Sequence, residues 1–195
     1  MQENIPCGPR DPTGQPLCIP TPASAYKDLR AAIHLPAFGV THVIDPFAGT
    51  GSTLRGVAPL PVVTNDINPV APTRFHLNML QPGAIQSLTR ALGTERSTLH
   101  AVVTAPQYAH LDLVLPLLVG QVDTICCVFT HVGYLEDNMP TRNQYLAGLS
   151  REGRLRVVTC KEIMPHHRMG VWICVCAGEL ASLMAHQGGE LLYPG

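Results

Sequence analysis

The chain has 195 residues, of which 46% are apolar and 14% are charged, and its net charge at pH 7 is −1. A chain of this size and composition can bury one substantial core, so we expect a single domain over residues 21–195. A net charge near zero argues against the strong cationic field of avid non-specific nucleic-acid binders. The sequence holds no run of roughly 18 apolar residues, so no membrane span is expected.

The seven cysteines and the N-terminal residues bear on the cellular compartment of the protein. No C-x-x-C pair is present, and five of the cysteines lie in apolar, strand-like runs. Thiols in such places are expected to be reduced and buried, which favours an intracellular protein without a metal site. Residues 1–4 lack the basic and apolar regions of a signal peptide, in keeping with an intracellular location.

The chain begins with a segment that shows no hydrophobic period. Six prolines or glycines precede Cys18, so residues 1–20 are predicted to form a flexible arm. A helix is predicted over Ala23–Ile33, because Pro22 suits a first helical turn and the body is rich in alanine.

A strand, a glycine turn and a helix follow between residues 42 and 57. The strand His42–Asp45 ends in an acid, Gly49 and Gly51 form the turn, and the helix is predicted over Ser52–Val57. Glycines let the backbone approach a ligand closely, and this order suits a nucleotide-type ligand at the carboxyl edge of an α/β sheet. The third glycine of the dinucleotide fingerprint is missing, and the acid before the turn would repel a pyrophosphate but suit an ammonium group.

Residues Asp45–Ser52 resemble the Asp-Pro-Phe-x-Gly-x-Gly motif of S-adenosylmethionine (SAM)-dependent amino-methyltransferases. The similarity is greatest to the small phage and mobile-element enzymes that make N6-methyladenine in DNA. The resemblance implies SAM as the cofactor, with the turn around its methionine half and the Thr-Pro before the first helix over its methionine end. The residues that it assigns to this half of the cofactor are Thr21, Pro22, Asp45, Pro46, Phe47, Ala48, Gly49 and Gly51.

The second strand, Pro61–Asn65, ends in Asp66, which lies 21 residues beyond Asp45. An acid at this spacing is placed to accept hydrogen bonds from ribose hydroxyls, and Ile67 is expected to lie against the adenine ring. The other interpretation is an aspartate that caps a turn. Helices are predicted at Ala71–Leu80 and Gly83–Leu92, and the third strand of such a sheet is expected to be very short or absent.

The next strand, Leu99–Thr104, is followed by Ala105-Pro106-Gln107-Tyr108. This segment resembles the Asp/Asn/Ser-Pro-Pro-Tyr/Phe motif, whose first side chain accepts a hydrogen bond from the target amine and whose ring stacks on a flipped base. Ala105 cannot accept that bond, which costs about 2–4 kcal/mol of barrier. Three explanations are open. The chain is a slow enzyme in which backbone carbonyls and the Gln107 amide oxygen accept the bond, a decayed relative that binds the cofactor without catalysis, or an enzyme whose target is not an amino nitrogen.

The rest of the chain supplies candidate substrate contacts. His131 and Tyr134 follow a strand predicted at Asp123–Phe129, and His167 and Arg168 lie in the loop of a predicted antiparallel hairpin. A purely structural role in the loop is the commoner explanation for His131 and Tyr134. Arginines near the hairpin are candidates for phosphate contact, with a solvated surface as the alternative: Arg151, Arg154 and Arg156. The remaining predicted elements are helices at Ala109–Val119 and Thr141–Glu152 and hairpin strands at Leu155–Lys161 and Val171–Ala177.

The order of elements predicts a three-layer, Rossmann-like α/β domain whose mostly parallel sheet has an antiparallel edge strand. The function that the resemblance implies is methyl transfer from SAM to an exocyclic amine, with adenine N6 in DNA as the first expectation and no metal. The alternatives are an inactive SAM-binding module that serves as a subunit or nucleic-acid partner, and an RNA or protein amino-methyltransferase. A nicotinamide oxidoreductase fits worst, because of the missing glycine and the acid before the turn.

Overall fold

The computed structural model describes residues 21–49, 51–91, 100–164 and 168–186. In this part of the chain a six-stranded sheet has the order β2-β1-β3-β4-β6-β5. The strands are β1 (His42–Asp45), β2 (Val62–Thr64), β3 (His100–Thr104), β4 (Ile125–His131), β5 (Leu155–Met164) and β6 (Arg168–Cys176). The predicted N-terminal arm lies outside the described residues.

One strand of this sheet runs against the others. β1 pairs in parallel with β2 and β3, and β3 pairs in parallel with β4. β6 is antiparallel to both β4 and β5, so the β5–β6 hairpin closes one side of the sheet. The predicted Rossmann-like α/β fold, mostly parallel with an antiparallel hairpin at one edge, is confirmed; the antiparallel strand itself, β6, is the last but one in the sheet.

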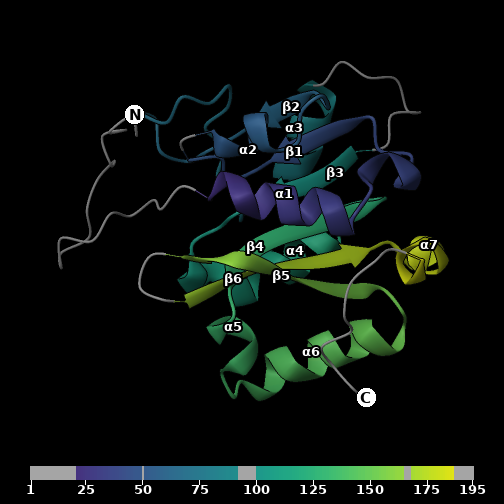
Figure 1. The fold of residues 1–195 in the computed structure, drawn as a ribbon. Coiled ribbons are helices and arrows are strands. Elements are labelled where there is room, and N and C mark those ends of the chain that lie inside the picture. Colours follow the sequence, from purple (N-terminus) through teal and green to yellow (C-terminus); the bar gives the residue numbers. More distant parts are fainter. Residues whose placement is uncertain (1–20, 50, 92–99, 165–167, 187–195) are drawn as a thin grey trace.

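Helices cover both faces of the sheet (Figure 1). They are α1 (Ala23–Ala32), α2 (Ser52–Gly56), α3 (Ala84–Ala91), α4 (Leu111–Val119), α5 (Gly133–Glu136), α6 (Pro140–Arg151) and α7 (Ala181–Ala185), with 3₁₀ turns at Leu35–Phe38, Tyr108–His110 and Gly178–Leu180. Side chains alternate along each strand, so neighbours such as Val43 and Ile44 enter opposite cores. One core lies beneath α1 and α7, and the other beneath α3, α4 and α6.

The core beneath α1 is fixed by one aromatic cluster. The Trp172 ring lies 5.3 Å from the Tyr26 ring and 5.0 Å from the Phe129 ring, and its indole N–H donates to the Ala25 carbonyl at 2.8 Å. The Tyr26 hydroxyl lies 2.7 Å from Thr53 Oγ1, which joins α1 to α2. The helix before the glycine turn is thus tied to the helix after it.

The predicted helix at Ala71–Leu80 is wrong. This segment is irregular, and Phe75 forms an isolated parallel bridge with Asn65 beside β2. Pro72 interrupts any helical period here, and the Asn65 side chain binds both backbone polar groups of Leu77. The expected third strand is therefore present only as this single bridge among the described residues.

The cysteine prediction holds where the structure describes it. Five cysteines on β4, β5 and β6 are buried free thiols. Burial raises the pKa of the Cys126 thiol, which keeps it protonated and unreactive at neutral pH.

Candidate cofactor and substrate site

The glycine turn and the tip of β2 form one hydrogen-bonded unit. Gly49 and Gly51 have φ values of 50° and 75°, the left-handed region that favours glycine. The Gly49 N–H donates to Asp66 Oδ2 at 2.9 Å, and the Asn68 N–H donates to Asp66 Oδ1 at 2.9 Å. The Asp66 carboxylate is thus held at the turn, and each oxygen keeps a lone pair for a further hydroxyl donor.

Asp45 is a buried acid beside this turn. It is 1% exposed, and its Oδ1 accepts hydrogen bonds from Thr104 Oγ1 at 2.6 Å and from the Phe47 N–H at 3.2 Å. Burial and, to a smaller extent, the charge of Asp66 raise the pKa of Asp45 to about 6 in spite of these bonds. Among the described residues no cation forms an ion pair with Asp45. An ammonium group would balance this charge.

Asn65 positions the turn, and sequence reasoning missed it. Its side-chain N–H₂ donates to the carbonyls of Pro46 and Leu77 at 3.0 Å, and its oxygen accepts from the Leu77 N–H at 2.7 Å. The Asn65 backbone carbonyl also accepts from the Ala48 N–H at 2.9 Å. The only signal in the sequence is an asparagine at the end of the predicted strand, directly before the predicted ribose acid.

The other predicted cofactor contacts differ in their exposure. Pro46 and Ala48 are buried, and Phe47 packs against the core beneath α3 and α4, so these three shape the turn. Ile67 is 62% exposed directly after Asp66, where an apolar side chain can meet a flat ligand. The remaining two, Thr21 and Pro22, precede α1, and Thr21 is buried.

Three of the predicted substrate residues meet beyond β3 and β4. The Tyr108 and His131 rings are stacked, with centroids 4.2 Å apart and planes inclined by 20°. Tyr134 contacts Tyr108 edge-on, with centroids 6.0 Å apart. Tyr108 is 38% exposed whereas Tyr134 is 1% exposed, so Tyr108 can contact a ligand and Tyr134 packs behind it in the protein interior.

The other three residues of the predicted catalytic segment directly precede Tyr108 in the chain. Ala105 is half-buried and packs against the core beneath α1. Pro106 is buried and Gln107 is exposed, before the short 3₁₀ turn that carries Tyr108. The site therefore combines an exposed aromatic ring with a strand end that has no side-chain acceptor at position 105.

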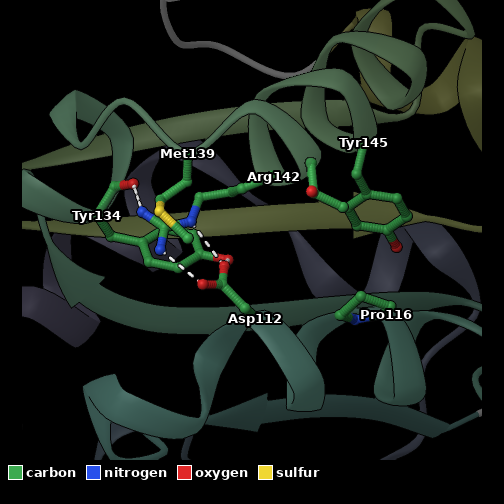
Figure 2. A pocket seen from close by; sticks show the side chains of 7 residues that line it. Asp112, Pro116, Tyr134, Met139, Arg142 and Tyr145 are labelled. Carbon is green, nitrogen blue, oxygen red and sulfur yellow. Dashed lines mark hydrogen bonds and ion pairs between the residues drawn. The ribbon is translucent and has the colours of Figure 1, made fainter.

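Arg142 holds this region together, and sequence reasoning missed it. It makes a bidentate ion pair with Asp112, at 2.6 and 2.7 Å, and donates to the Tyr134 carbonyl at 2.6 Å. The guanidinium lies 3.8 Å over the Tyr134 ring, and the Tyr134 hydroxyl donates to Asp112 at 2.9 Å (Figure 2). The Arg142 hydrogen bonds lower the pKa of Asp112, so that both charges persist at neutral pH. The residues line a pocket of about 380 Å³ together with Pro116, Met139, Thr141 and Tyr145.

The predicted arginine cluster lies elsewhere. Arg154 donates to the Cys176 carbonyl at 2.9 Å and pairs with Glu152 at 3.0 Å, and Arg156 is 5% exposed. Both arginines lie at the start of β5, which runs parallel to β1, so they lie at the sheet edge opposite Asp45. His167 lies outside the described residues. Arg168 begins β6 and pairs with Met164, but its side chain is not described.

The described residues contain neither of two other kinds of feature. No helix in the described ranges is long and apolar enough to cross a membrane. Within the same ranges no group of three or more His, Cys, Asp or Glu side chains is arranged to hold a metal ion.

The six-stranded, mostly parallel sheet with helices on both faces is a Rossmann-like α/β fold. Residues 32–95, which include the glycine turn and Asp66, match the model of the D12 class N6 adenine-specific DNA methyltransferases. This match confirms the predicted resemblance and, with it, SAM as the cofactor of the family that the chain resembles. It covers one third of the chain and ends before Ala105. No curated protein sequence matches.

Solved structures with some similarity in shape include methyltransferases. A dimethyladenosine transferase from Plasmodium falciparum is 13% identical with a TM-score of 0.46, over 85% of this chain and 65% of that one. The O-methyltransferase TomG from Streptomyces achromogenes, in complex with SAM, is 10% identical with a TM-score of 0.48, over 83% and 82%. An O-methyltransferase from Bacillus cereus is 11% identical with a TM-score of 0.44, over 83% and 94%. At these scores the likenesses carry no information about the substrate of this chain.

Proposed function

We propose that the chain transfers a methyl group from SAM to an exocyclic amine, with adenine N6 in DNA as the substrate. The observation that carries the proposal is the unit of Asp45, the glycine turn and Asp66, beside an exposed aromatic ring at the next strand end. The family match to residues 32–95 supports both the cofactor and the adenine target.

The residues of this unit fit SAM by their chemistry. Asp45 is a buried carboxylate that lacks a cation among its described neighbours, and it would take the ammonium group. Asp66 keeps lone pairs for the ribose hydroxyls, and the exposed Ile67 would cover one face of the adenine. SAM supplies an electrophilic sulfonium methyl when bound.

On the substrate side, Tyr108 would stack on a base that has left its duplex. The attacking amine needs an acceptor for its N–H bonds, and at the end of β3 the carbonyl groups and the exposed Gln107 are the candidates. Holding the amine in line with the methyl group supplies most of the acceleration in such a reaction.

The cofactor part is tested by calorimetric titration of SAM. We expect micromolar binding to the wild type and a loss of about 10- to 100-fold in Asp66→Ala, because a hydrogen bond to a charged group is worth about 1.5–3 kcal/mol. Asp123→Ala is the matched control, since Asp123 is an exposed aspartate that precedes β4 at the opposite edge. Wild-type protein that does not bind SAM would remove the proposal.

A second function is supported by Ala105: a SAM-binding module that does not turn over. Ala105→Asn separates the two. If the site is a weak catalyst, the restored acceptor raises methylation of adenine-containing single-stranded DNA by about tenfold or more. If the protein is a binding module, SAM affinity persists and no methylation appears in either form. Thermal unfolding is the control, because Ala105 packs against the core beneath α1.

A further inference from the structure

Tyr108 is held from three sides although its ring lies in an exposed turn. His131 covers one face of the ring, Tyr134 packs nearly perpendicular to it, and the Tyr108 hydroxyl donates to Asp137. A half-exposed tyrosine ordinarily samples several side-chain rotamers. These contacts come from residues 23 to 29 positions further along the chain, and together they select one orientation of the ring.

The acceptor of the Tyr108 hydroxyl is itself fixed. Asp137 ends α5, where its N–H donates to the Gly133 carbonyl at 2.9 Å. Its carboxylate lies 3.7 Å from Arg142 Nη1, and Arg142 is anchored by its bidentate pair with Asp112. The end of the Tyr108 side chain is therefore connected to a buried guanidinium rather than to a mobile surface group.

We propose that Asp137 is a positioning residue which, with His131, holds Tyr108 as a pre-ordered stacking surface for a planar base. This inference rests on the proposed function and names how that same site receives its substrate. His131 occupies one face of the ring, so an incoming base stacks on the opposite face. Ordering a side chain during binding costs about 0.5–1.5 kcal/mol, which corresponds to about 2- to 10-fold in affinity. The effect belongs to KM and not to kcat.

The test compares Asp137→Ala and Asp137→Asn with Glu136→Ala, which removes an exposed acid from the same short helix. The first readout is the ultraviolet titration of Tyr108, isolated by difference from Tyr108→Phe. Burial makes the largest contribution to raising the pKa of Tyr108, and the hydrogen bond to the Asp137 carboxylate, together with its charge, raises it as well. Both Asp137 variants are expected to lower the Tyr108 pKa, and Glu136→Ala is expected to leave it unchanged.

The second readout is the affinity for a single-stranded oligonucleotide that contains 2-aminopurine, followed by its fluorescence. Asp137→Ala is expected to weaken binding about 2- to 10-fold with kcat changed less than twofold. Asp137→Asn is expected to restore the affinity, because an amide oxygen still accepts the hydroxyl, while the Tyr108 pKa stays lowered. This split between the two readouts would not arise from a general loss of structure.

Three results would overturn the inference, and they are distinct. An unchanged Tyr108 titration in Asp137→Ala shows that the contact is not made. A shifted titration with unchanged oligonucleotide affinity shows that the contact does not assist stacking. A shifted titration in a protein whose wild type neither binds nor methylates the oligonucleotide overturns the nucleobase substrate, and with it the stacking role.

Discussion

Gly56→Ala is expected to lower the free energy of unfolding by about 3 kcal/mol, the upper range for overpacking a well-filled core. A Cβ at position 56 would lie 2.2–2.6 Å from three atoms of the Tyr26 ring. The ring has little room to move, because its hydroxyl contacts Thr53 and the ring packs against Trp172, with centroids 5.3 Å apart and planes inclined by 57°. Denaturant unfolding followed by Trp172 fluorescence measures the change, since Trp172 is the only tryptophan.

Gly148→Ala is the matched control for this substitution. Gly148 lies inside α6, and a Cβ there meets nothing within 4 Å. Alanine is a better helix former than glycine by about 1 kcal/mol, so this variant is expected to be as stable as the wild type or more so. A second test is the double variant Gly56→Ala with Tyr26→Leu, which should recover part of the loss left by Gly56→Ala alone. Equal stabilities for Gly56→Ala and the wild type would show that α1 does not pack on α2 as described.

The same contact explains why α1 matters to the glycine turn. Arg30 donates to the Gly56 carbonyl, and Tyr26 contacts Thr53 in the helix that directly follows Gly51. Thr21 and Pro22, which the resemblance assigns to the cofactor's methionine end, directly precede α1, so their position depends on these contacts. A variant that separates α1 from α2 is therefore expected to lose SAM affinity as well as stability.

The fold and the strand, turn and acid that carry the predicted cofactor residues were predictable because their signals are local. A strand that ends in Asp45, a glycine turn and an acid at the tip of the next strand occupy 25 consecutive residues, and the fold brings Asp66 to the Gly49 N–H. The failure at residues 71–80 has the opposite origin. Periodicity suggested a helix, but the side chain of Asn65 binds the backbone of Leu77 and prevents one.

The substrate side was predictable only in part, because some of its contacts join residues that are far apart in the sequence. The motif resemblance selected Tyr108, and position after a buried strand selected His131 and Tyr134. Nothing in the sequence connects them to Arg142, whose pairing with Asp112 spans 30 residues. The arginines near the hairpin show the converse error, because proximity in sequence placed Arg154 and Arg156 with the site while the direction of β5 puts them at the other edge.

Asp45→Asn is expected to abolish most SAM binding while making the unliganded protein more stable at pH 7.5. Asparagine has the same shape and keeps an oxygen for Thr104 and for the Phe47 N–H, while its N–H₂ group can donate to the Thr53 hydroxyl that also bonds to Asp45. It cannot provide a charge for an ammonium group, and removing one partner of such a contact costs about 3–5 kcal/mol. Calorimetric affinity is expected to fall at least 100-fold.

The gain in stability follows from the direction of the pKa change. In the folded protein the pKa of Asp45 is raised to about 6 from 3.8, so the folded state binds more protons between these values. The stability of the wild type therefore falls as the pH rises from about 4 to 6 and is flat above. This loss is about 3 kcal/mol at most, from 1.36 kcal/mol per pKa unit. Asparagine carries no charge, so the variant lacks the decline.

Two measurements examine this pair of effects. Denaturant unfolding at pH 7.5 should favour Asp45→Asn by about 2 kcal/mol, and the difference should vanish near pH 4; Asp123→Asn, at an exposed position, should show neither. SAM affinity of the wild type should rise as the pH increases from 5 to 7, since the ammonium group binds ionised Asp45. A variant that is less stable at pH 7.5, or that binds SAM as tightly as the wild type, would mean that Asp45 is a structural acid and not the cofactor's counter-ion.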